Sequence, residues 1–60
     1  PVSVQLLVPY REQAVLTLIE ERGTIEEQRY QAEGILVEAR IPSSLLPRVE
    51  HYVRSAPDNA

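Results

Sequence analysis

Apolar and polar side chains alternate along the first segment of the chain, from Val2 to Val8. The positions on one side are Val2, Val4, Leu6 and Val8, and those on the other are Ser3, Gln5 and Leu7. Strict period two with β-branched residues on one face predicts a half-buried strand. Pro9 should end this strand, because proline has no N–H to donate to a sheet ladder.

The next segment, from Arg11 to Arg22, follows a helical rather than an alternating pattern. Its apolar positions at helical spacing are Val15, Leu18 and Ile19, with Ala14 widening the stripe. This pattern predicts an amphipathic helix with one buried face. Gly23 follows directly, and we expect it to adopt the left-handed conformation that often closes a helix.

Two further strands are predicted, Thr24–Ala32 and Ile35–Ile41, on either side of Glu33-Gly34. A two-residue loop at Glu33-Gly34 would make them a hairpin in which Ala32 faces Ile35. A longer loop remains an alternative.

Charge supports the register of the two-residue loop. Arg29 would face Glu38 and Glu27 would face Arg40, and each opposite-charge pair contributes about 0.2–1 kcal/mol. A slip of one residue would break both pairs and place Val37 beside the charges. The same register pairs Tyr30 with Val37 and Gln28 with Ala39.

A second helix is predicted to begin at Ser44, which would cap it. Its buried stripe consists of Leu45, Leu46, Val49, Tyr52 and Val53. Pro47 falls in the first turn, where its missing N–H does no harm. Glu50 and Arg54 would form an i,i+4 ion pair on this helix.

The element order β-α-β-β-α predicts an α+β fold in one small domain over residues 1–54, with a flexible C-terminal tail over 55–60. A right-handed crossover makes the first two strands parallel, and the returning strand lies between them. We therefore expect a three-stranded antiparallel sheet of order 1-3-2 with both helices on one face. The helix-covered face should carry Val4, Leu6, Tyr30, Val37 and Ile41. The other face should stay open and carry Ser3, Gln5, Leu7, Glu27, Arg29, Leu36, Glu38 and Arg40.

Composition narrows the class of protein. The chain has 60 residues, 43% of them hydrophobic, and no cysteine. A core without disulfides is therefore expected, and a thiolate metal site is excluded. No apolar run approaches the roughly 18 residues of a membrane span. The chain begins at Pro1 rather than Met, so we expect it to be a segment of a longer protein.

The net charge of -3 argues against nonspecific binding to nucleic acid, because neutralisation of phosphates supplies most of that affinity. A protein partner is the better expectation, and direct nucleic-acid binding by this segment is not expected. A phosphate-binding loop is ruled out, since the chain has two glycines and no lysine.

No catalytic, cofactor-binding or metal-ligating residue is predicted. His51 is the only histidine and should lie on a helix surface, whereas a structural zinc site takes about four N or S ligands. The acidic pairs Glu20-Glu21 and Glu26-Glu27 should be solvated, while general acid–base catalysis needs a carboxyl group with a raised pKa.

The best functional candidate is the open sheet face, because charged residues and two leucines could form a partner surface there. Its candidate residues are Leu7, Glu27, Arg29, Leu36, Glu38 and Arg40. An ordinary solvated face is the competing interpretation. Pairing of a partner strand with a sheet edge is another.

Short motifs along the chain resemble a known family. They are LLVPY at residues 6–10, then Glu21-Arg22-Gly23, Glu33-Gly34 and the run VEARIP from Val37 to Pro42. Together with the elements between them, they are similar to the domain that follows the G domain in bacterial HflX-type GTPases. The resemblance covers about Val2 to Tyr52.

The resemblance implies a function for the parent protein. Such a protein would bind GTP and Mg²⁺ through its preceding G domain, associate with the large ribosomal subunit, and act in splitting or rescuing stalled ribosomes under stress in the cytoplasm. This segment would be a non-catalytic accessory domain that docks on its own G domain or near the GTPase-associated region of the ribosome. The alternative is a free-standing regulatory module that dimerises through the open sheet or binds a small ligand.

Overall fold

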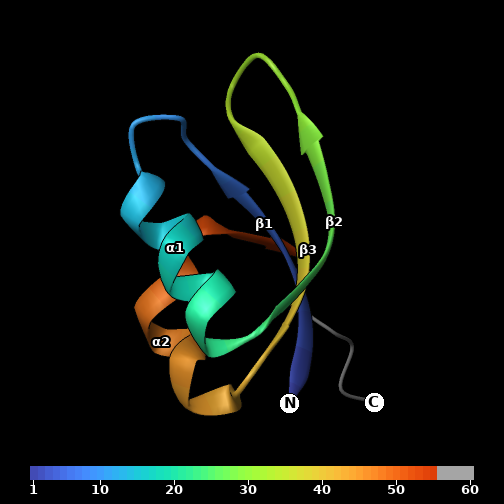
Figure 1. The fold of residues 1–60 in the computed structure, drawn as a ribbon, viewed down its shortest axis with the longest axis vertical. Coiled ribbons are helices and arrows are strands. Elements are labelled where there is room, and N and C mark those ends of the chain that lie inside the picture. Colours follow the sequence, from blue (N-terminus) through green and yellow to red (C-terminus); the bar gives the residue numbers. More distant parts are fainter. Residues whose placement is uncertain (56–60) are drawn as a thin grey trace.

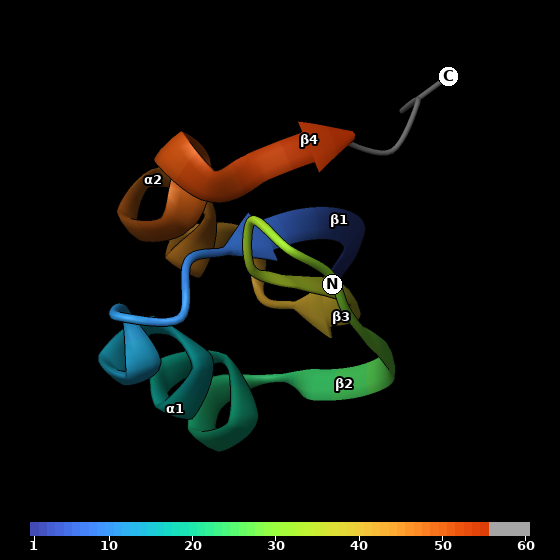
Figure 2. The same cartoon turned by 90° about the horizontal axis from the view of Figure 1, so that it is seen from above.

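The structure is a computed structural model that describes residues 1–55. Neighbouring strands are antiparallel and follow the order β2-β3-β1-β4. Both helices lie on the same face of the sheet (Figures 1 and 2). The predicted α+β class is therefore confirmed. In chain order the elements are β1 (Val2–Val8), α1 (Gln13–Arg22), β2 (Thr24–Tyr30), β3 (Ile35–Ile41), the 3-10 turn η1 (Ser43–Leu45), α2 (Leu46–Val49), the 3-10 turn η2 (Glu50–Tyr52) and β4 (Val53–Ser55).

The sheet has four strands, so the prediction of three was wrong. The expected order 1-3-2 is kept, and β4 adds to the free side of β1, where Val53 faces Leu6 and Ser55 faces Gln5. The element order β-α-β-β-α-β is that of the ferredoxin-like split arrangement. Residues 56–60 of the predicted tail lie outside the described residues, and Ser55 is the last residue of β4.

The second helix is much shorter than predicted, because the chain turns extended at Val53 to pair with β1. One α-helical turn is flanked by two 3-10 turns. Ser44 lies inside η1 and makes no cap hydrogen bond, so its predicted role was wrong. Pro47 does occupy the first turn of α2. Arg54 is in β4 and forms no ion pair with Glu50 within residues 1–55.

Helix α1 begins two residues later than predicted, after a turn in which the N–H of Glu12 donates to the carbonyl of Pro9 at 2.9 Å. The buried residues of α1 are Leu16 and Ile19. Ala14 is exposed, so the apolar face is centred closer to Leu16 than the spacing predicted.

Gly23 does not adopt a left-handed conformation, and that prediction was wrong. Its φ is -137° and its ψ is -157°, an extended conformation, while its N–H donates to the carbonyl of Ile19 at 2.8 Å. A Cβ at this position would overlap the carbonyl oxygen of Arg40 and lie 2.9 Å from Cγ2 of Ile41. The glycine is therefore required for close approach of the chain to β3.

The hairpin loop lies one residue earlier than predicted. Gln31 and Gly34 exchange two backbone hydrogen bonds of 2.9 and 3.3 Å, which leaves Ala32 and Glu33 as the loop residues. From Glu27 to Tyr30, each β2 residue therefore faces a β3 residue that lies two positions earlier in the sequence than the predicted partner. A shift of two keeps every side chain on its predicted face, because side chains alternate with period two.

The predicted charge pairs across the hairpin were wrong as a result. Arg29 faces Leu36 rather than Glu38, and Glu27 faces Glu38 rather than Arg40. The pairings of Tyr30 with Val37 and of Gln28 with Ala39 were wrong too, since Tyr30 faces Ile35 and Gln28 faces Val37.

An irregularity near the start of β2 changes the direction of one side chain. Ile25 faces Ala39 and Glu27 faces Glu38, which leaves Glu26 as an extra residue, as in a β-bulge. Without this extra residue Ile25 would face Arg40 on the open face. The bulge instead places Ile25 on the helix-covered side, where it packs against the core.

The core lies between the sheet and the two helices, and no polar side chain of residues 1–55 is buried in it. Four of the five predicted core residues of the sheet are buried, but Tyr30 is 71% exposed. Tyr30 ends β2 at the hairpin, which extends beyond the helices (Figure 1). None of the helices in residues 1–55 has the length and apolar character to span a bilayer. The buried side chains are Val4, Leu6, Val8, Leu16, Ile19, Ile35, Val37, Ala39, Ile41, Leu45 and Val49.

Candidate interaction surface

The sheet face opposite the helices, called the open face below, is organised in rows that run across the strands. Alternation of side chains places the odd-numbered residues of β1 and the even-numbered residues of β3 on this face. The pairing of β1, β3 and β2 then defines three rows, Ser3–Arg40–Thr24, Gln5–Glu38–Glu27 and Leu7–Leu36–Arg29.

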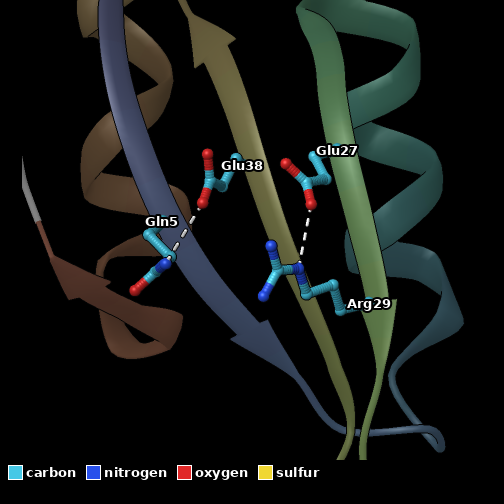
Figure 3. A network of polar contacts seen from close by, with 4 residues as sticks. All are labelled: Gln5, Glu27, Arg29 and Glu38. Atoms are coloured by element: carbon cyan, nitrogen blue, oxygen red, sulfur yellow. Dashed lines mark hydrogen bonds and ion pairs between the residues drawn. The ribbon is translucent and has the colours of Figure 1, made fainter.

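The central row brings two carboxylates together. Glu27 and Glu38 face each other on neighbouring strands, an arrangement that is unfavourable for like charges. Each carboxylate has a second neighbour (Figure 3): Nε of Arg29 donates to Oε2 of Glu27 at 2.9 Å, and Nε2 of Gln5 donates to Oε2 of Glu38 at 3.4 Å. The repulsion between the two acids is offset by these contacts.

Arg29, from the neighbouring row, is the cation that forms an ion pair with Glu27. Its pKa is raised above the ordinary value, first because its side chain donates a hydrogen bond to Glu27, and then because the charge of Glu27, and to a smaller extent that of Glu38, attracts it. The side chain is exposed, so the ion pair is screened by water and contributes little to folding. Its guanidinium remains accessible to a partner.

The row next to the loop is apolar at its centre. Leu7 and Leu36 face each other and both are half-buried on the open face. Arg29 completes this row on β2. The row therefore presents two adjoining leucines beside an arginine, a combination that occurs in the buried centres of protein interfaces.

Arg40 lies in the third row, at the opposite end of the strands. It lines a shallow hollow of about 520 Å³ together with Arg22, Gly23 and Thr24. Neither Arg22 nor Arg40 takes part in an ion pair within the described part of the chain. Sequence reasoning did not place these two arginines near each other. The sequence did contain a signal for this proximity. Arg22 ends α1 one residue before β2 begins, and the start of β2 pairs with the end of β3, where Arg40 lies.

A second hollow, of about 250 Å³, lies over the strands between the two sheet edges. Its polar lining includes Ser3, Gln5 and Glu38, with Glu26 from β2 and Ser55 from β4. Ser55 was not predicted on this surface, because β4 itself was not predicted.

All six predicted surface residues lie on the strands of this one face: Leu7, Glu27, Arg29, Leu36, Glu38 and Arg40. The structure brings Glu27 to Arg29 and Leu7 to Leu36. It does not bring Arg29 to Glu38, or Glu27 to Arg40, as direct partners. The face is thus a mixed surface of two carboxylates, two arginines and a leucine pair.

Within residues 1–55 no group of three or more histidine, cysteine, aspartate or glutamate side chains is close enough to hold a metal ion. His51 is exposed in η2.

Comparison of the chain with protein-family models, with curated proteins and with solved structures found no match.

Proposed function

We propose that this chain is a non-catalytic interaction domain that binds a protein partner through the open face. The observation that carries the proposal is the row Leu7–Leu36–Arg29, an apolar pair flanked by an accessible guanidinium. The buried centre of a protein interface is more apolar than the rest of the surface, and arginine is enriched at interfaces. The acidic row beside it adds charge complementarity toward a partner that presents basic groups.

The short motifs of the sequence support a more specific form of this proposal. They resemble the domain that follows the G domain in HflX-type GTPases. In this form the chain is an accessory domain of a cytoplasmic, ribosome-associated GTPase, and GTP and Mg²⁺ are bound by the preceding G domain. The partner of the open face is then that G domain or the large ribosomal subunit.

The first experiment is to determine the intact mass and upstream sequence of the native protein that contains this segment. A heavier chain with a phosphate-binding loop ahead of Pro1 is expected. A native product of about the present size would overturn the GTPase form of the proposal and leave the interaction surface to be tested separately.

The second experiment compares that native protein with variants of the open face. Arg29→Glu and Leu36→Thr should each reduce its co-sedimentation with large ribosomal subunits, or the docking of the domain on its G domain. Arg48→Glu, an exposed arginine on α2, is the matched control and should bind normally. GTP hydrolysis by the pure 60-residue chain would contradict the non-catalytic role.

A further inference from the structure

Strand β2 ends the sheet on one side, so its outer backbone groups have no partner strand within residues 1–55 (Figure 2). Such an edge is a template for pairing with another strand. The side chains along it are mostly exposed, including Glu27, Arg29 and Tyr30. A strand added here would need no rearrangement of the core.

The hairpin determines which backbone groups of β2 point outward. Gln31 and Gly34 bond each other through both N–H and C=O, so the groups of Gln31 point inward to β3. These groups alternate in direction along an antiparallel strand. Arg29 and Glu27 therefore also point inward, while Gln28 and Tyr30 present their N–H and C=O at the free edge.

Two copies of this strand can pair in only a few registers. An antiparallel pair related by a two-fold axis perpendicular to the sheet keeps each face on the same side, so residues that face each other must have the same side-chain direction. The axis must then pass midway between two copies of the same residue, which is the centre of the pairing. In the regular part of β2, between the bulge and the loop, the available centres are Glu27, Gln28, Arg29 and Tyr30.

Charge favours one of these four centres. A centre at Tyr30 would place Arg29 opposite Gln31 of the second copy and would bring no opposite charges together. A centre at Glu27 would place two carboxylates opposite each other, and a centre at Arg29 would do the same for two guanidinium groups. A centre at Gln28 instead places Glu27 opposite the partner's Arg29 and Arg29 opposite the partner's Glu27. Those two pairs would occupy non-hydrogen-bonded positions, where facing side chains are closest.

We propose that the chain forms a symmetric dimer in which β2 pairs antiparallel with β2 of a second copy, centred on Gln28. Gln28 exchanges both backbone hydrogen bonds with its counterpart, and the outward groups of Tyr30 lie next along the edge. The bulge at Glu26 interrupts the regular pairing toward the start of β2 and limits the interface to its hairpin half. The dimer continues the sheet across both copies and joins two open faces into one surface.

This dimer does not rest on the proposed function, since it needs no G domain and no ribosome. Sedimentation equilibrium of the pure 60-residue chain over a wide concentration range should show a reversible monomer–dimer equilibrium. Glu27→Arg and Arg29→Glu should each raise the dissociation constant about tenfold or more, because each replaces two attractive pairs with two repulsive ones. The double variant that carries both changes should return to within about threefold of the parent chain, by the same pairing argument.

Matched controls change the same charge away from β2. Glu50→Arg in η2 and Arg48→Glu in α2 are exposed positions and should leave the dissociation constant unchanged. Circular dichroism checks that every variant is folded. A chain that stays monomeric at millimolar concentration, or a double variant as weak as the single ones, would overturn the proposal.

The register has an independent test, because the chain contains no cysteine. Gln28→Cys places two thiols opposite each other at a Cα separation of about 5.5 Å, within the range that a disulfide spans. Oxidation should convert this variant to a covalent dimer. Thr24→Cys on the same strand should remain monomeric, because the register gives it no facing cysteine. Equal cross-linking of the two variants would contradict a dimer centred on Gln28.

Discussion

Gly34 lies directly against the end of β1, so that a Cβ built on it would stand 2.5 Å from the carbonyl oxygen of Val8 and 3.1 Å from the Cα of Pro9. Both atoms belong to the backbone and cannot rotate away. Gly34→Ala should therefore push the loop end of the hairpin away from the end of β1. The expected loss in the free energy of unfolding is about 1–3 kcal/mol, as for other overpacked positions. Urea unfolding followed by circular dichroism measures the change.

Glu33→Ala is the control for Gly34→Ala, since Glu33 is an exposed residue of the same loop. Its free energy of unfolding should change by no more than about 0.5 kcal/mol. Equal stabilities for the parent chain and Gly34→Ala would show that the loop does not pack against Val8 as described.

Tyr10 links the β1–α1 connection to the hairpin, because its hydroxyl donates to the carbonyl of Gln31 at 2.5 Å. Tyr10→Phe removes this hydrogen bond and keeps the ring. We expect a loss of about 0.5–1 kcal/mol in the free energy of unfolding, at the low end of the usual range for a neutral hydrogen bond. The carbonyl still accepts the N–H of Gly34, which keeps the loss small.

Tyr30→Phe is the matched control for the hydroxyl deletion. The Tyr30 hydroxyl lies 3.4 Å from Oε1 of Gln28, and the side chain is 71% exposed. Its removal should be close to neutral. If Tyr30→Phe destabilised the chain more than Tyr10→Phe, the contact between Tyr10 and Gln31 would not hold the hairpin in place.

Ile19 is the residue of α1 that is completely buried against the sheet. Ile19→Val should lower the free energy of unfolding by about 0.5–1.5 kcal/mol and Ile19→Ala by about 2–5 kcal/mol. A domain of this size has marginal stability, so the alanine variant should be largely unfolded at 37 °C. Thermal unfolding of the graded pair, with exposed Thr17→Ala as control, checks the expectation. A cost for Thr17→Ala as large as that for Ile19→Val would contradict this packing.

The sequence was most informative where burial depends on a simple alternation. Val4, Leu6 and Val8 alternate strictly and all three are buried as predicted. The order of the first three strands followed from the handedness of the crossover. Burial of apolar side chains contributes a large free energy, so the alternating pattern records it well. The crossover rule holds for nearly all connections of this kind, so it orders the strands from the sequence of elements.

The hairpin register could not be predicted, because it was inferred from exposed charges. Pairs such as Arg29 with Glu38 contribute at most about 1 kcal/mol across a sheet. Two other features accompany the observed register: Gly34 packs against the backbone of Val8, and the bulge lets a partly buried Ile25 pack against the core. The bulge has no local signal in TIEEQRY that distinguishes it from a regular strand.

Strand β4 was missed for a related reason. Leu46, Val49 and Val53 keep helical spacing, and Glu50 with Arg54 completes an i,i+4 pattern. The preference of Val53 for the free side of β1 is a long-range effect. The residues predicted for the open face do lie on that face, whereas the two charge pairs predicted between them do not face each other.

The apolar pair on the open face provides the last prediction. Leu7 and Leu36 face each other and are half-buried on the side of the sheet without helices. Leu7→Thr and Leu36→Thr each introduce threonine, which is favourable in strands. Each should therefore change the free energy of unfolding by no more than about 1 kcal/mol. Each should nevertheless weaken binding of the proposed partner by more than about 1 kcal/mol, roughly fivefold, as truncation of a hot-spot residue near the centre of an interface does.

Leu46→Thr is the control for this pair, since Leu46 is a half-buried leucine of α2 that packs with the core on the other side of the sheet. It should affect stability more than binding, whereas the open-face variants should do the reverse. Binding is measured by co-sedimentation of the native protein with its partner, and stability by urea unfolding of the 60-residue chain. If all three substitutions weakened binding only in proportion to lost stability, the open face would be an ordinary solvated surface rather than a partner surface.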